Sequence, residues 1–168
     1  GHPGSLTART TATVTSLPTG RRNWSTVDGV KFGFVVPWGD ADDVGDLAEA
    51  AEEAGWDGLF VWEPVWGVDA WIALGLAAVR TSRIRLGTLV TSATFRYPGP
   101  LAISVAQVDA MSGGRVDFGL GAGWFEEEHS AYGIPFPSLG ERFDKLEESL
   151  AVITGLWETP VGQKFSYD

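Results

Sequence analysis

The sequence contains no cysteine, so disulfide bonds and thiolate chemistry are excluded, and the chain fits a reducing, cytoplasmic compartment. Basic residues are also scarce: 12 Lys and Arg stand against 22 Asp and Glu, which gives a formal net charge of −10. Such a body repels phosphate backbones and anionic lipid headgroups. We therefore expect neither nucleic acid nor a membrane as a partner. No apolar run approaches the ~20 residues of a membrane-spanning helix.

Histidine occurs only twice. His129 closes the acidic stretch "EEEH" (126–129), but consecutive side chains cannot all converge on one ion, so we expect no metal site.

The length of 168 residues suits a single domain with one core. The first thirty residues differ from the rest because they are rich in Thr, Ser, Gly and Pro and show no sustained period. We interpret residues 1–30 as a flexible tail or, in part, cloning residue, and residues 31–168 as the folded unit.

Apolar runs and amphipathic stretches alternate along the folded unit. Runs of β-forming residues predict strands, and helical spacing of apolar residues predicts helices. The strands are expected over 31–37, 56–62, 84–91 and 115–121, and the helices over 40–55, 69–81, 98–114 and 140–157. Four βα units imply an α/β fold with a parallel sheet, either an open doubly wound sheet or part of a (β/α)8 barrel.

In both architectures ligands bind at the carboxyl ends of the strands. The segments that follow the predicted strands are aromatic: Trp38, Trp66 and Trp124 occur in three of them, and Phe95-Arg96-Tyr97 in the remaining one. Trp62 lies within a predicted strand and is expected in the core. A site lined by aromatic rings favours a planar ligand.

The glycine-rich stretch "GRVDFGLGAGW" (114–124) invites comparison with dinucleotide-binding loops. It contains G-x-G-x-G rather than G-x-G-x-x-G, with Trp124 in the place of the third glycine, and it follows the fourth predicted strand instead of the first. Dinucleotide binding is therefore a poor interpretation. Two alternatives remain: the glycines admit a flat ligand, or they permit tight packing inside a barrel.

Two stretches carry a family resemblance, "RIRLGTLVTSATFRYPGPLAISVAQVDAMSGGRVDFGLGAGW" (83–124) and "EEEHSAYGIPFPSLGERFDKLEESLAVITGLW" (126–157). They resemble the N-terminal half of the luciferase-like monooxygenase family, which includes bacterial luciferase-like enzymes and coenzyme F-420-dependent oxidoreductases. The resemblance implies a (β/α)8 barrel of which this chain holds only about the first four βα units, a half-barrel. It also implies a flavin- or deazaflavin-dependent oxidoreductase or monooxygenase that acts on a small organic substrate.

The same resemblance assigns site residues by position. It implies a non-proline cis peptide at Leu89-Val90, behind the cofactor ring, and a catalytic acid at Glu63. The cofactor-binding residues that it implies are Trp38, Leu89, Val90, Phe95, Arg96, Ala122, Gly123 and Trp124. The "TFRY" stretch (94–97) is similar to the deazaflavin branch, so coenzyme F-420 is expected, with FMN as the alternative.

Departures from the family pattern limit what the resemblance implies. Ala122 stands where flavin monooxygenases can carry an arginine for the FMN phosphate, and this weakens the case for FMN. Pro64 and Trp124 stand where the sugar-phosphate dehydrogenases of the deazaflavin branch have a histidine and a carboxylate, so their substrate is not transferred to this chain.

Ordinary structural roles compete with these assignments. Glu63 could cap a helix, and Arg96 could either neutralise an anionic ligand or pair with a neighbouring acid. A half-barrel also has two unpaired strand edges. We therefore expect a second copy of the chain or a complementary C-terminal half as partner, and a non-catalytic oligomerisation or interaction module is the alternative function.

Overall fold

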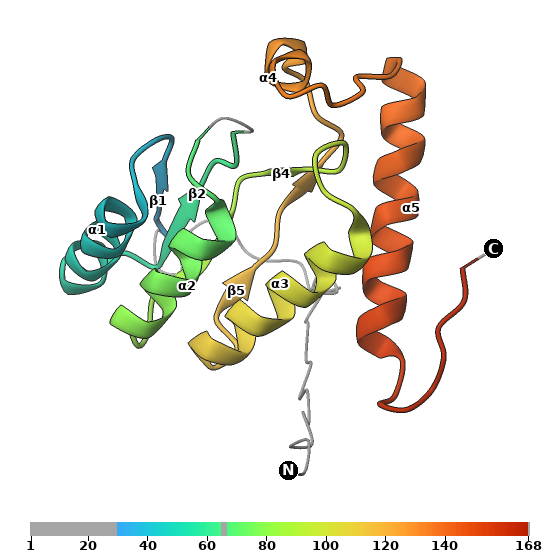
Figure 1. Cartoon of the computed structure of the whole chain (residues 1–168). Helices are drawn as coiled ribbons and strands as arrows, with labels where there is room; N and C mark the ends of the chain where they lie inside the picture. The colour runs from blue at the N-terminus through green and yellow to red at the C-terminus, as the bar shows by residue number, and fades with distance from the viewer. Residues whose placement is uncertain (1–29, 65–66, 168) are drawn as a thin grey trace, which may run out of the picture.

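The computed structural model describes residues 30–64 and 67–167. Strands and helices alternate along these residues, as the sequence predicts (Figure 1). The strands are β1 (Gly33–Val36), β2 (Gly58–Val61), β3 (Arg85–Thr88), β4 (Thr91–Ser92), β5 (Val116–Asp117) and β6 (Leu120–Gly121). The helices are α1 (Ala41–Glu53), α2 (Ala70–Arg80), α3 (Pro98–Ser112), α4 (Glu126–Ala131) and α5 (Leu139–Glu158).

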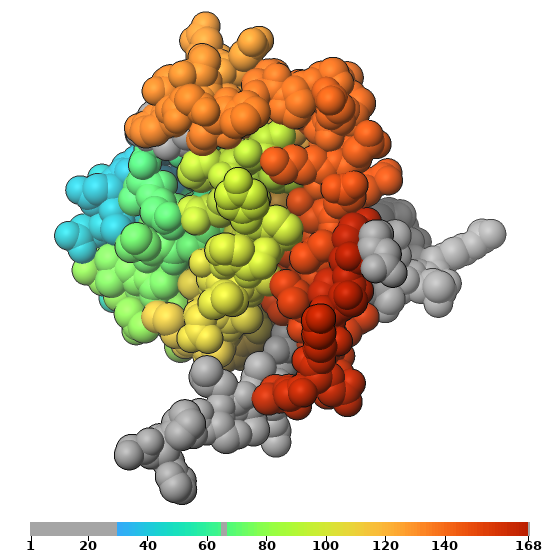
Figure 2. Space-filling view, turned by 45° about the vertical axis from the view of Figure 1, so that its right-hand side comes forward, coloured from blue at the N-terminus to red at the C-terminus, as the bar shows by residue number. Residues whose placement is uncertain are grey.

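The main sheet is parallel, with the strand order β1-β2-β3-β5, and β4 pairs with β6 in a short second sheet. Helices α1, α2 and α3 cover one face of the main sheet, and α5 packs beside α3 (Figure 1). In the space-filling view the helices follow one another across the surface in chain order (Figure 2). A doubly wound sheet would reverse its strand order and carry helices on both faces. The arrangement is therefore an arc of a βα barrel, and the predicted fold is confirmed.

Side-chain caps start three of the long helices. Asp40 and Asp43 form a reciprocal capping box at α1, and Ser138 forms another with Glu141 at α5. Asp69 accepts hydrogen bonds from the backbone N–H groups of residues 71 and 72 at the start of α2. These carboxylate and hydroxyl oxygens satisfy backbone donors that the first helical turn leaves without partners.

The core lies between the sheet and its helices. Leu59, Val61 and Leu86 project from the central strands, are at most 1% exposed, and pack among the small and branched apolar residues of α1, α2 and α3. Phe60 projects from the opposite face of the sheet, where an added Cβ on Gly58 would lie 2.8 Å from its ring. Glycine therefore makes room for this aromatic ring on the uncovered face.

The third and fourth predicted strands are each interrupted, which corrects the prediction of two continuous strands. The Leu89-Val90 peptide separates β3 from β4 and is cis, as predicted. At the same level Gly119 lies so close to β3 that an added Cβ would stand 2.3 Å from the Thr88 carbonyl oxygen. A Cβ on Gly121 would stand 2.8 Å from Val90. The glycines of the "GLG" stretch thus serve the tight packing of these strands, one of the two alternatives left by the sequence.

Helix α4 is absent from the predicted elements because six residues are too few to show a helical period. The proposed tail lies almost wholly outside the described residues, as does Trp66. Within the described residues, no helix has both the length and the apolar character needed to cross a membrane.

Candidate functional site

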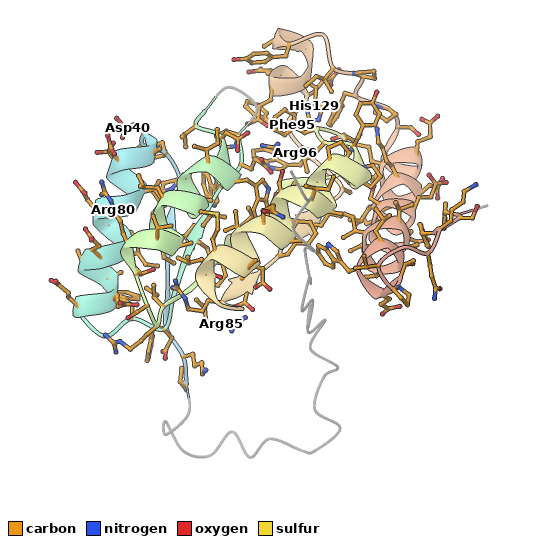
Figure 3. The ribbon with its side chains drawn as sticks, turned by 60° about the horizontal axis from the view of Figure 1, so that its bottom comes forward. Asp40, Arg80, Arg85, Phe95, Arg96 and His129 are labelled. Atoms are coloured by element: carbon orange, nitrogen blue, oxygen red, sulfur yellow. The ribbon has the colours of Figure 1, made fainter. Side chains whose placement is uncertain are left out.

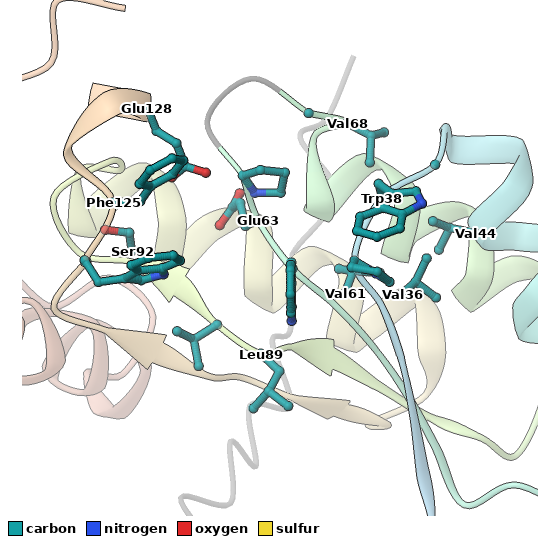
Figure 4. Close-up of a pocket in the computed structure, with 18 of the residues that line it drawn as sticks. Val36, Trp38, Val44, Val61, Glu63, Val68, Leu89, Ser92, Phe125 and Glu128 are labelled. Carbon is teal, nitrogen blue, oxygen red and sulfur yellow. The ribbon is translucent and has the colours of Figure 1, made fainter. Parts of the chain in front are cut away.

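A cavity of about 700 Å³ opens at the carboxyl ends of the strands (Figure 4). Trp38 and Val44 lie on one side, Ser92, Phe125 and Glu128 on the other, and Glu63 between them. The described residues that line it are Val36, Pro37, Trp38, Gly39, Val44, Val61, Trp62, Glu63, Pro64, Gly67, Val68, Leu89, Val90, Ser92, Gly123, Trp124, Phe125, Glu128 and His129. None of these side chains is a lysine or an arginine, His129 is the one imidazole among them, and most are apolar.

The cavity brings together most of the residues that the sequence singled out. Trp38, Glu63, Leu89, Val90, Gly123 and Trp124 all line it. Ala122, Phe95 and Arg96 are outside its lining. Ala122 directly precedes the lining residue Gly123, whereas Phe95 and Arg96 are labelled close to His129 and away from Arg85 (Figure 3).

Glu63 is held by an ion-pair network at the end of β2. Its Oε1 accepts a hydrogen bond of 2.6 Å from the Arg96 Nε, and Arg96 also donates to Asp69 Oδ2 over 2.7 Å. Arg96 therefore pairs with neighbouring acids, which is the second of the two roles considered for it. Its guanidinium also lies 5.1 Å from the centre of the Phe95 ring.

The two oxygens of Glu63 have unequal surroundings. Oε2 is buried and has no hydrogen-bond partner among the described residues. Burial raises the pKa of Glu63, although the nearby Thr91 hydroxyl and the Arg96 guanidinium favour the charged form. For Asp69 the hydrogen bonds from Arg96 and from backbone N–H groups outweigh burial and lower the pKa. Glu63 is thus the carboxyl group of this pair that more readily holds a proton near the cavity.

Gly123 shapes the wall formed by the segment after β6. Its φ is +83°, a left-handed conformation that suits glycine, and an added Cβ would lie 2.6 Å from Ser92 Oγ and 2.7 Å from Thr94 Oγ1. The next residue, Trp124, stacks on Phe125 with ring centres 5.1 Å apart and remains largely exposed. This wall is a flat aromatic surface beside a backbone that carries no side chain.

Sequence reasoning missed part of the cavity. Trp62 was expected in the core, but it is 50% exposed and lines the cavity, because it projects toward the sheet face that no helix of the described residues covers. Ser92, Thr94 and His129 were not predicted as site residues, yet they form a hydrogen-bonded chain beside Gly123 in which Thr94 and His129 are buried. The only signal was position: Ser92 and Thr94 fall in a segment that follows a predicted strand, and His129 comes directly after another such segment. Among the described residues, no three His, Asp or Glu side chains form a group that could hold a metal ion.

A singly wound βα arc with a ring-sized cavity at the strand ends defines a class of barrel enzymes. The family model for luciferase-like monooxygenases matches residues 6–168, and the chain belongs to this family. The F-420-dependent glucose-6-phosphate dehydrogenase of Amycolatopsis mediterranei is 36% identical over 124 residues, which are 68% of this chain and 37% of that protein. The enzyme of the same name from Nakamurella multipartita is 36% identical over 75% of this chain and 39% of its own length. The chain thus spans about two fifths of the length of these relatives.

Solved structures of the same fold match the described arc. The coenzyme F-420-dependent tetrahydromethanopterin reductase of Methanopyrus kandleri is 31% identical, with a TM-score of 0.59 over 64% of this chain and 31% of that one. An F-420-dependent secondary alcohol dehydrogenase, solved with an F-420–acetone adduct, is 28% identical, with a TM-score of 0.69 over 82% of this chain and 46% of that one. A monooxygenase from Streptomyces bottropensis reaches 0.68 at 29% identity, over 83% of this chain and 46% of that one.

Proposed function

We propose that this chain forms one half of the site of an oxidoreductase that transfers hydride between coenzyme F-420 and a small organic substrate. The observation that carries the proposal is the cavity of about 700 Å³ at the strand ends, where a buried acid faces aromatic walls. Relatives and neighbours named as F-420-dependent support the choice of cofactor. FMN is the alternative cofactor within the same family.

The residues present fit a planar tricyclic ring, which coenzyme F-420 and FMN both have, so the choice of F-420 rests on the relatives. Trp38, Trp62 and Trp124 provide flat apolar surfaces, and the absence of a Cβ at Gly123 lets this wall pack closely against Ser92 and Thr94. No Lys or Arg is among the described lining residues, so this half of the site offers no guanidinium or ammonium to a phosphate. When bound, the deazaflavin would supply a carbon centre that accepts or donates hydride.

Glu63 would supply the proton that accompanies hydride transfer. Burial raises its pKa toward neutral pH, and Oε2, which has no hydrogen-bond partner among the described residues, is the oxygen available to donate or accept a proton. Arg96 holds the other oxygen and so fixes the orientation of the carboxyl group. In this proposal Arg96 and Phe95 are positioning residues, and Leu89, Val90 and Gly123 form the surface against which the ring lies.

Titration with both cofactors tests this function. We expect the purified protein, in the assembly that it forms in solution, to bind coenzyme F-420 saturably and FMN more weakly, as followed by cofactor fluorescence. Binding of neither cofactor would overturn the enzyme proposal and favour a non-catalytic interaction module.

The sheet edges support a second proposal, that the chain associates with a second copy or with a complementary half-barrel. Within the described residues, β1 and β5 each pair with one strand of the main sheet only. Phe32 and Phe34 are exposed at the β1 edge, and such apolar edges favour strand pairing between chains. Sedimentation of the 18.0 kDa chain tests self-association. A stable monomer at micromolar concentration would contradict it.

A further inference from the structure

A hydrogen-bonded chain of three side chains leads away from the cavity wall. Ser92 lines the cavity, and its Oγ lies 2.6 Å from Thr94 Oγ1. Thr94 Oγ1 lies 2.7 Å from the His129 Nε2, and His129 Nδ1 lies 2.9 Å from the Phe125 carbonyl oxygen. His129 is 1% exposed and Thr94 is 6% exposed, so bulk water does not compete for the hydrogen bond between them, whereas Ser92 is partly exposed at the cavity.

The Phe125 carbonyl determines which atoms donate and which accept in the hydrogen bonds that join Ser92, Thr94 and His129. A carbonyl oxygen can only accept, so Nδ1 of His129 carries a proton, and the protonation of Nε2 alone remains variable. In the neutral imidazole, Thr94 donates to Nε2 and Ser92 donates to Thr94. Ser92 then presents only lone pairs to a ligand.

Protonation of Nε2 reverses both hydrogen bonds. The imidazolium donates to Thr94, Thr94 donates to Ser92, and the Ser92 hydroxyl proton becomes free to donate to a ligand. One proton taken up at His129 therefore appears as one hydrogen-bond donor at Ser92, with no bond to carbon made or broken.

We propose that Ser92, Thr94 and His129 form a proton-linked hydrogen-bond donor that binds an acceptor oxygen, carbonyl or anionic, of the ligand in the cavity. Ser92 is the contact residue, and Thr94 and His129 are positioning residues. The proposal rests on the proposed function for the identity of the ligand, but the hydrogen-bonded chain itself does not depend on it.

Other charged groups lie around this chain. Glu128 precedes His129 and lines the same cavity, as does Glu63. On the far side the His129 ring packs against Phe136, with ring centres 4.8 Å apart, and the Arg142 guanidinium lies 4.0 Å over the Phe136 ring. The two carboxyl groups can themselves take up a proton, whereas Arg142 stays charged throughout. Any proton uptake must therefore be assigned with Glu63→Gln and Glu128→Gln as controls.

Nitrogen NMR of the His129 imidazole tests the hydrogen bonds from Ser92 to His129 without any cofactor. Because the sequence has only His2 and His129, a His2→Gln variant leaves a single imidazole spectrum to assign. We expect neutral His129 to carry its proton on Nδ1. In Thr94→Val the Nε2 signal should move toward that of an imidazole nitrogen that accepts no hydrogen bond. In Thr94→Ser it should return to its position in the wild type. An Nε2–H form in the neutral protein, or an unchanged signal in Thr94→Val, would overturn the proposal.

Calorimetry with coenzyme F-420 in buffers of different ionisation enthalpy tests the link to binding. We expect the wild type, Thr94→Ser and Glu63→Gln to take up a proton when the cofactor binds. Thr94→Val and Ser92→Ala should lose this proton uptake. These two variants should also bind the cofactor about tenfold more weakly, which is the factor for one charge-assisted hydrogen bond. Binding that is equally tight and equally proton-linked in Thr94→Val would overturn the proposal. Absence of F-420 binding in every variant, with the NMR result intact, would instead overturn the proposed function.

Discussion

Two glutamates at opposite ends of the sheet have opposite environments. Glu52, near the amino ends of the strands, accepts hydrogen bonds from the backbone N–H groups of residues 82, 83 and 84 and from the Ser82 hydroxyl. These bonds lower its pKa to about 2 even though burial opposes the shift. Glu63, at the carboxyl ends, has one oxygen without a hydrogen-bond partner in the part of the chain that the structure describes, and burial raises its pKa. Full satisfaction of one carboxylate stabilises the fold, and incomplete satisfaction of the other leaves it available to a ligand.

The arginines repeat this contrast. All five N–H donors of Arg115 are used at the amino end, by the carbonyl groups of residues 78, 81, 84 and 112 and by the Thr81 hydroxyl. Arg96 at the carboxyl end instead binds two carboxylates beside the cavity. In βα barrels the amino end supports stability and the carboxyl end supports chemistry, and the two arginines divide in the same way.

The largest expected effect is at Arg115. Arg115→Ala would leave several buried carbonyl groups without donors, and we expect the free energy of unfolding to fall by about 3 kcal/mol. Arg115→Lys should recover little, because an ammonium cannot reproduce the planar set of donors. Chemical denaturation measures both variants. An Arg115→Ala protein as stable as the wild type would show that this network is dispensable.

An intermediate effect is expected at Arg96. Arg96→Met leaves Glu63 and Asp69 without their cation, and we expect a loss of about 2 kcal/mol, less than for a fully buried pair. Adding Glu63→Gln to Arg96→Met should restore part of this loss, because the uncompensated charge is removed. Denaturation of both single variants and the double variant gives the coupling between the two positions. Strictly additive effects would contradict a direct role of Arg96 in holding Glu63.

The smallest effect is the pH dependence contributed by Glu52. Because its folded-state pKa is lowered from 4.5 to about 2, its stabilisation is present above pH ~4.5 and is lost as the pH falls toward 2. Because solvent screens this carboxylate, we expect its contribution to the free energy of unfolding to be only about 1 kcal/mol. Glu52→Gln should remove this contribution to the slope of the free energy of unfolding against pH.

The contribution of Glu63 to this slope has the opposite sign. Because its pKa is raised in the folded state, the free energy of unfolding falls as the pH rises through the titration of Glu63. Stability curves of the two Gln variants between pH 2 and 6 check both signs, and slopes of the same sign would contradict the comparison.

Local signals made much of the fold predictable. Asp40 and Asp69 stand where helix starts were expected, Ser138 caps a helix that was expected to start two residues later, and the apolar runs located every main strand. The breaks within the third and fourth strands were not predicted in full, because they depend on how closely Gly119 approaches Thr88 across the sheet. That approach is a tertiary contact and leaves no period in the sequence.

The site was predictable where one position at a strand end was enough. Glu63, Trp38 and Gly123 could be located in this way. The chain from Ser92 to His129 could not, because its members are up to 37 residues apart and meet only when α4 packs beside the β4 loop. Trp62 was wrongly predicted to lie in the core, because the sequence of a strand does not show which of its apolar residues face the helices.

The most direct test of the contrast between the two ends is a titration of coenzyme F-420 into the wild type, Glu63→Gln and Glu52→Gln at neutral pH, followed by cofactor fluorescence. We predict saturable binding by the wild type, unchanged affinity in Glu52→Gln and about tenfold weaker binding in Glu63→Gln, which corresponds to about 1.4 kcal/mol. Equal affinities in Glu63→Gln and Glu52→Gln would contradict the assignment of the carboxyl end as the ligand site and of Glu63 as its acid.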